Sequence, residues 1–168
     1  YVNGIIPWNM DEDIQKLGGA GAKSLVESVM VIKMLFALKQ NPELAKMMSS
    51  VKRIFKYSAR TVLTDDFQIS DYDDSFGKYV FKKRIPTWMN DKRKEYADHL
   101  YITRMFSFCP SLLDNYIQSL HTVLAAIQEY GLDTEHAHFF AIDKKYVTEF
   151  EQLHCQGIMA TNGAIENY

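Results

Sequence analysis

The sequence is poor in cysteine, proline and glycine, and neither sign of charge dominates it. Two cysteines in 168 residues argue against a disulfide-stabilised domain and favour a reducing, intracellular compartment. Four prolines and eight glycines are too few for a fibrous or low-complexity chain. The net charge of −2 excludes a strongly basic nucleic-acid binder on bulk charge alone. We therefore expect one ordinary globular domain.

Long apolar runs are also missing. The most apolar stretch, residues 29–38, contains Lys33 and is about half the ~20 residues that a membrane-spanning helix needs. We therefore expect no membrane span. The chain begins with Tyr1 rather than methionine, so we expect a domain or processed fragment of a larger protein.

The chain is rich in apolar side chains at helical spacing. Hydrophobic residues make up 47% of the sequence, which is enough for one buried core. The spacing predicts helices over residues 23–40, 42–62, 90–109, 111–131 and 134–157, the last of them as one helix or as two joined near Asp143. The predicted fold class is thus an all-α, single-domain bundle of five to six helices.

Four residues mark where these helices begin and end. Asn41 and Pro42 predict the start of the second helix, because asparagine caps helix N-termini and proline fits the first turn. Asp133 is the predicted cap of the last helix. Gly131 predicts the end of the preceding helix, because glycine readily adopts the left-handed conformation there.

The chain divides into three segments by pattern. Residues 1–22 predict an irregular N-terminal segment with a short helix, residues 23–157 a helical domain, and residues 158–168 a polar tail. Within the helical domain, residues 64–90 are the only long stretch without helical periodicity. We predict a long polar connection there, with room for a short β-hairpin. A long non-helical excursion in a compact domain is more often functional than idle.

Five aspartates lie in that connection, ahead of a basic group. The pattern Asp71-x-Asp73-x-Ser75 places oxygen ligands at the first, third and fifth positions of a calcium loop. Such a loop also needs glycine at the sixth position and glutamate at the twelfth, where Phe76 and Lys82 stand. The histidines and cysteines lack compact zinc spacings. We therefore predict no metal site and no cofactor.

Basic residues concentrate in the middle of the chain. Residues 52–94 carry a net charge of +5, and the rest of the chain carries −7. On the predicted second helix, lysine or arginine recurs every four residues and would form a basic ridge. Such a ridge could contact nucleic-acid phosphates or an acidic partner. The candidate binding residues are Lys52, Lys56, Arg60, Lys82, Lys83, Arg84 and Lys92.

One short stretch suggests catalysis. The sequence RKEYADH, from Arg93 to His99, resembles the arginine–histidine signature of the HEPN family. The resemblance implies a small α-helical domain in which Arg93 and His99 converge on an RNA phosphate for metal-independent cleavage. In such a mechanism the histidine moves the 2′-hydroxyl proton, and the arginine stabilises the charge that develops on the phosphate.

The predicted function is a protein-interaction or assembly module that binds a partner protein or a second copy, because no catalytic motif is complete. The first alternative is an RNA-binding or HEPN-like ribonuclease domain that uses the basic middle region. The second alternative is a helical domain that binds a small apolar ligand. It is based on the eight methionines, because flexible methionines suit adaptable pockets.

Overall fold

The computed structural model describes residues 10–158 and 163–168 and corrects the predicted fold class. The chain is a mixed α/β domain and not an all-α bundle, because nine strands form three sheets in the described residues. The elements, with η for 3₁₀-helices, are α1 (Met10–Gln40), α2 (Pro42–Met48), β1 (Ile54–Tyr57), β2 (Thr61–Leu63), η1 (Ile69–Ser75), β3 (Tyr79–Lys82), β4 (Ile85–Pro86), η2 (Lys92–Glu95), β5 (His99–Leu100), β6 (Met105–Phe108), η3 (Pro110–Leu112), α3 (Leu113–Tyr130), α4 (Thr134–Ala141), η4 (Lys144–Tyr146), β7 (Val147–Phe150), β8 (Cys155–Ile158) and β9 (Ile165–Asn167).

The predicted helix boundaries are confirmed where a cap defines them. Asn41 accepts hydrogen bonds from the backbone N–H groups of Glu43 and Leu44, at 2.9 and 3.2 Å, at the start of α2. Gly131 has a φ of 66° and ends α3 in the left-handed conformation. The Asp133 side chain caps α4. Local backbone chemistry therefore fixes these ends.

The predicted helices over residues 42–62 and 90–109 are wrong over most of their length. The first ends at Met48 and is followed by β1 and β2; the second region contains η2, β5 and β6 and no α-helix. The strand sequences IFKY and MFSF are rich in β-branched and aromatic residues, which favour a pleated, half-buried surface. Their apolar positions also fit a helical period, so periodicity alone misassigned them.

The chain ends also differ from the prediction. The predicted helix over residues 134–157 stops at Ala141, and β7 and β8 follow. In the predicted polar tail, β9 pairs with β8 and Tyr168 is buried. At the other end, α1 crosses the predicted boundary at residue 22 and is bent at Gly18, within the glycine-rich run. Residues 1–9 of the predicted irregular segment and residues 159–162 of the tail lie outside the described residues.

A four-stranded sheet with the order β1-β6-β3-β7 forms the centre of the fold. Strands β1, β6 and β3 are antiparallel neighbours, and β7 is parallel to β3. Both faces of the sheet are covered. Alternate residues of a strand point to opposite faces, so β3 and β6 each supply two cores.

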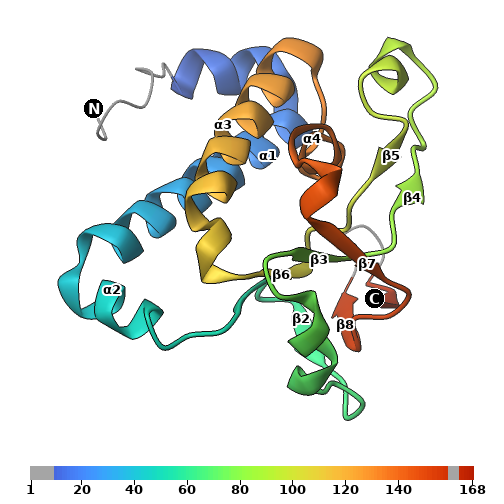
Figure 1. Cartoon of the computed structure of the whole chain (residues 1–168). Coiled ribbons are helices and arrows are strands. Elements are labelled where there is room, and N and C mark those ends of the chain that lie inside the picture. The colour runs from blue at the N-terminus through green and yellow to red at the C-terminus, as the bar shows by residue number, and fades with distance from the viewer. Residues whose placement is uncertain (1–9, 159–162) are drawn as a thin grey trace.

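The larger core lies between this sheet and the helices. Tyr79 and Phe81 of β3 and Phe106 and Phe108 of β6 point into it and meet buried residues of α1 and α3. Figure 1 shows α1 and α3 together on one side of the strands, with α2 projecting away. None of the α2 residues is buried.

The smaller core lies on the opposite face. Val80 of β3 and Met105 of β6 enter it, where they join Tyr72 of η1, Cys155 of β8 and Tyr168. The sheet of β2, β8 and β9 covers this side, and Figure 1 shows β2 and β8 across the central strands from the helices. The predicted connection over residues 64–90 therefore supplies η1 and the central strand β3.

We predict that Phe81 is among the most stabilising residues of the domain. Its ring is fully buried and stacks on Tyr101 and Phe106, with centroid distances of 4.5 and 4.8 Å. Phe81→Ala should lower the free energy of unfolding by about 3–5 kcal/mol, as measured by urea denaturation. Phe76→Ala is the matched control: Phe76 is 80% exposed and its loss should change the value by less than about 0.5 kcal/mol. Equal effects of the two substitutions would contradict the assignment of the core.

Candidate functional site

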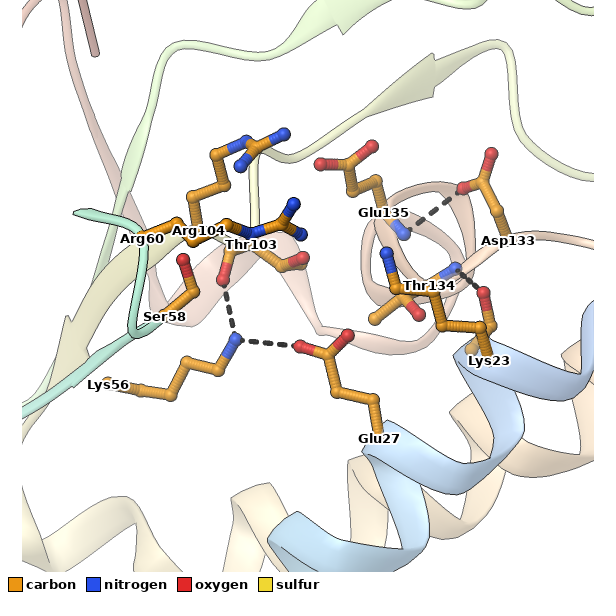
Figure 2. Close-up of a pocket in the computed structure, with 11 residues that line it drawn as sticks. Lys23, Glu27, Lys56, Ser58, Arg60, Thr103, Arg104, Asp133, Thr134 and Glu135 are labelled. Atoms are coloured by element: carbon orange, nitrogen blue, oxygen red, sulfur yellow. Dashed lines mark hydrogen bonds and ion pairs between the residues drawn. The ribbon is translucent and has the colours of Figure 1, made fainter. Parts of the chain in front are cut away.

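A polar cleft of about 280 Å³ opens between α1, the turn from β1 to β2, the segment before β6 and the start of α4. Figure 2 shows basic side chains on the strand side of the cleft, and Lys23 together with the carboxylates on the helix side. The cleft therefore combines segments that are far apart in sequence. This is the usual way in which a fold builds a binding site.

Lys56, predicted as part of an exposed ridge, points into this cleft. Its Nζ donates to Glu27 Oε1 at 3.0 Å and to the carbonyl oxygen of Thr103 at 2.8 Å, and its side chain is 15% exposed. The predicted helical ridge is wrong, because Lys56 lies on β1 while Lys52 and Arg60 lie beyond its two ends. Lys56 and Arg60 share the cleft, and Lys52 lines a different pocket.

Two cations of the cleft are not neutralised. Lys23 of α1 and Arg60 of the β1–β2 turn are exposed and line the cleft. Within residues 10–158 and 163–168, neither side chain has a hydrogen-bond or ion-pair partner. Arg104 also lines the cleft and donates to the carbonyl oxygen of Ile158 at 3.2 Å.

The carboxylates of the cleft differ in their surroundings. Burial raises the pKa of Glu135, and the nearby charge of Asp133 raises it further. Burial would also raise the pKa of Asp133, but hydrogen bonds from the side chain and backbone of His136 outweigh it, and the pKa is lowered. Asp133 is therefore charged at neutral pH, and Glu135 accepts a proton more readily than an exposed glutamate.

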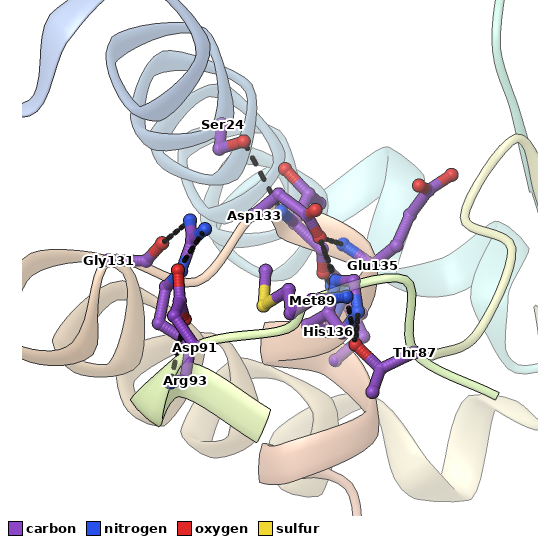
Figure 3. A network of polar contacts seen from close by, with 11 residues as sticks. Ser24, Thr87, Met89, Asp91, Arg93, Gly131, Asp133, Glu135 and His136 are labelled. Atoms are coloured by element: carbon purple, nitrogen blue, oxygen red, sulfur yellow. Dashed lines mark hydrogen bonds and ion pairs between the residues drawn. The ribbon is translucent and has the colours of Figure 1, made fainter. Parts of the chain in front are cut away.

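A hydrogen-bonded chain holds Asp133 in place, as Figure 3 shows. His136 Nδ1 lies 2.8 Å from Asp133 Oδ1, and His136 Nε2 lies 2.7 Å from Thr87 Oγ1. Thr87 also accepts a hydrogen bond from the backbone N–H of Met89 at 3.0 Å. His136 is fully buried, and Thr87 is not among the residues that line the cleft. These hydrogen bonds therefore position α4 against the loop after β4.

The structure places Arg93 and His99 in separate environments. Arg93 forms a forked pair with the carboxylate of Asp91 and donates to the carbonyl oxygen of Gly131 at 3.4 Å, so it holds η2 to the end of α3. His99 lies on β5, with Nδ1 2.9 Å from Asp98 Oδ1 and its ring 5.5 Å from that of Phe139. The HEPN resemblance implied an all-helical fold, which the structure contradicts.

The other predicted binding residues are dispersed, and several have local partners. Lys82 donates to the carbonyl oxygen of Asn167 at 2.9 Å, and Lys83 pairs with Glu151. Arg84 Nε lies 3.7 Å from Glu149 Oε1. Lys92 is exposed on η2.

A second opening, an apolar groove of about 600 Å³, lies between η1 and the start of β1. Two large apolar side chains at the ends of η1 line it: Ile69 is 67% exposed and Phe76 is 80% exposed. Tyr72 and Phe55 also line the groove, with ring centroids 5.0 Å apart. In the sequence, Phe76 stands at the sixth position of an incomplete calcium loop, and that pattern gives no sign of this surface. The only sign of the groove in the sequence is the presence of large apolar residues within a run of aspartates.

Arg53 fixes the wall of this groove. It lines the groove itself and joins η1 and the turn before β3 to β6. Burial lowers the pKa of its guanidinium, and the nearby Cys109, Tyr72 and Asp73 offset this only in part. The guanidinium donates to the carbonyl oxygens of Tyr72, Ser75 and Lys78 and to Ser107 Oγ.

Comparison with known proteins gives no family for this chain. No protein-family model, curated protein sequence or solved structure matches it. In the described part of the chain, no group of three or more histidine, cysteine or acidic residues is arranged to hold a metal. No described helix is long and apolar enough to span a membrane. The cleft and the groove are therefore the features of the molecule that bear on its function.

The side chain of His138 gives α4 a pH-dependent stability. It is buried, with Nδ1 2.7 Å from the carbonyl oxygen of Thr134 and Nε2 3.2 Å from the Tyr116 hydroxyl. Burial lowers its pKa to about 4, from 6.5. Between these values the unfolded chain binds a proton that the folded chain does not, so stability is lost as the pH falls.

We predict that the free energy of unfolding falls by up to about 3 kcal/mol between pH 6.5 and pH 4 because of His138. His138→Gln should flatten this part of the profile, even if the variant is less stable overall. Urea denaturation at a series of pH values measures the effect. His121→Gln, on the partly exposed surface of α3, is the control and should keep the wild-type slope. A slope unchanged in His138→Gln would contradict the assignment.

Proposed function

We propose that this chain is a protein-interaction module that binds an extended segment of a partner in the groove between η1 and β1. The observation that carries the proposal is the exposure of Ile69 and Phe76 at a groove of about 600 Å³. Scattered apolar residues are common on protein surfaces, but large ones gathered at a groove mark binding sites. The Arg53 hydrogen bonds support the groove wall, which favours a preformed site.

The charge around the groove indicates a basic partner. Five aspartates in and before η1 are exposed, and none forms an ion pair with another described residue. One of them, Asp73, lines the groove itself, together with Lys52 and Arg53. Opposite charges on two surfaces steer their association and select against like-charged partners. The partner segment should therefore alternate apolar and basic side chains. The five exposed aspartates in and before η1 are Asp65, Asp66, Asp71, Asp73 and Asp74.

The edge of the central sheet supports an extended partner. Within the described residues β1 pairs only with β6, so its other edge has no neighbouring strand. Phe55 of β1 lines the groove, and so do Lys52 and Arg53, which precede the strand. An added strand can pair with such an edge while its alternate side chains fill an adjacent groove.

The two alternatives receive less support from the geometry. The acidic residues around η1 would repel nucleic-acid phosphates, and several basic candidates already pair with carboxylates. The small-ligand alternative was based on methionines inside a helical pocket. Three of these methionines lie on the surface instead: Met30, Met34 and Met47 are 60%, 49% and 62% exposed.

A peptide-binding experiment tests the proposal. A short fluorescent peptide of alternating lysine and valine should bind saturably, as measured by anisotropy at fixed ionic strength. Ile69→Ser combined with Phe76→Ser should weaken binding by at least about tenfold, because exposed apolar anchors supply most of the affinity. A lysine–serine peptide tests for charge alone, and a glutamate–valine peptide tests for apolar contact alone. Both should bind much more weakly.

The matched control is Val62→Ser combined with Ile165→Ser. These two side chains are 66% and 68% exposed and lie on the small β2-β8-β9 sheet, away from the groove. The control should keep the wild-type affinity. Equal weakening by both pairs, or no preference for the lysine–valine peptide, would contradict the proposal. Concentration-dependent dimerisation that excludes the peptide would show that a second copy occupies the groove.

A further inference from the structure

The polar cleft is a site separate from the groove, and the proposed function does not use it. The two openings share no lining residue. The cleft is walled by α1, the β1–β2 turn and α4, whereas the groove is walled by η1 and the chain before β1. A ligand in the cleft would therefore be bound independently of the partner segment.

Two basic side chains of the cleft have no partner among the described residues. Lys56 is matched by Glu27, at 3.0 Å. Lys23 and Arg60 line the same cavity from opposite sides, and neither side chain is paired in the described part of the chain. Cations that converge from different elements on one cavity are the arrangement that binds an anion.

Two of the three carboxylates that line the cleft have partners: Glu27 pairs with Lys56, and Asp133 pairs with His136. Asp133 accepts hydrogen bonds from the backbone N–H groups of Glu135 and His136 and contacts the His136 ring. Burial and the nearby charge of Asp133 raise the pKa of Glu135, and the charge of Arg104 opposes this only in part. Figure 2 shows Arg60 and Arg104 together on one wall and Lys23 on the other.

We infer that this cleft binds the phosphate group of a small ligand, with Arg60 and Lys23 as the residues that contact it. A phosphate presents several oxygens and can accept from an arginine and a lysine at once, which a single carboxylate does less well. The hydroxyl-bearing residues Ser58, Thr103 and Thr134 also line the cavity. The volume of about 280 Å³ suits a phosphomonoester or a phosphorylated side chain rather than a large cofactor.

Titration with inorganic phosphate tests the site. Amide chemical shifts of the full chain are followed by NMR while sodium chloride keeps the ionic strength constant, which removes general screening. Phosphate should produce saturable shifts at Lys23, Arg60 and Thr134. Arg60→Gln and Lys23→Gln should each weaken binding by about tenfold, the loss expected for one charge-assisted hydrogen bond. Because both side chains are exposed, these variants should keep the wild-type spectrum elsewhere.

Lys92→Gln is the control, because it removes one positive charge from η2, outside the cleft. It should bind phosphate as the wild type does. Two further probes distinguish the source of the phosphate: ribose 5-phosphate represents a free metabolite, and a phosphoserine peptide represents a modified protein. Tighter binding of either one than of inorganic phosphate, with the same dependence on Arg60, supports the site. Absence of saturation with all three probes, or equal weakening by Lys92→Gln, would overturn the inference.

Discussion

The burial of β3 and β6 on both faces is the constraint on which the rest of the structure depends. Tyr79, Phe81, Phe106 and Phe108 face the helices, and Val80 faces the smaller core. Neither face can be exposed without loss of apolar burial, so helices must cover one side and the β2-β8-β9 sheet with η1 the other. The long helices α1 and α3 and the short strands are thus parts of one layered domain.

Both candidate sites lie where this layered frame ends, at and around the edge strand β1. On the helix side, Lys56 reaches from β1 to Glu27 of α1 and forms part of the cleft. On the other side, Arg53 joins η1 to β6 and forms part of the groove. The same edge therefore presents a basic polar cavity to one side and an apolar groove with aspartates to the other. This difference in chemistry is why we assign two different ligands to the two openings.

The sequence predicted the parts that local chemistry determines. The caps at Asn41 and Asp133 and the glycine end of α3 depend on residues a few positions apart. The strands could not be found in the same way, because Ile54 pairs with Phe108 across the chain and the helical period fits both segments. The sites were missed for the same reason. Lys56 was a candidate, but its contact with Glu27 exists only through tertiary packing.

Native-state hydrogen exchange tests the central claim, that the sheet buried on both faces holds the domain together. Amides of β3 and β6 should exchange slowest, together with those of α3, and only through global unfolding. Amides of η1 and α2 should exchange much faster through local opening, because η1 packs at the edge of the smaller core and α2 has no buried residue. Slowest exchange in α1 and α2, with early exchange of β3 and β6, would contradict the account and point to a core made of helices alone.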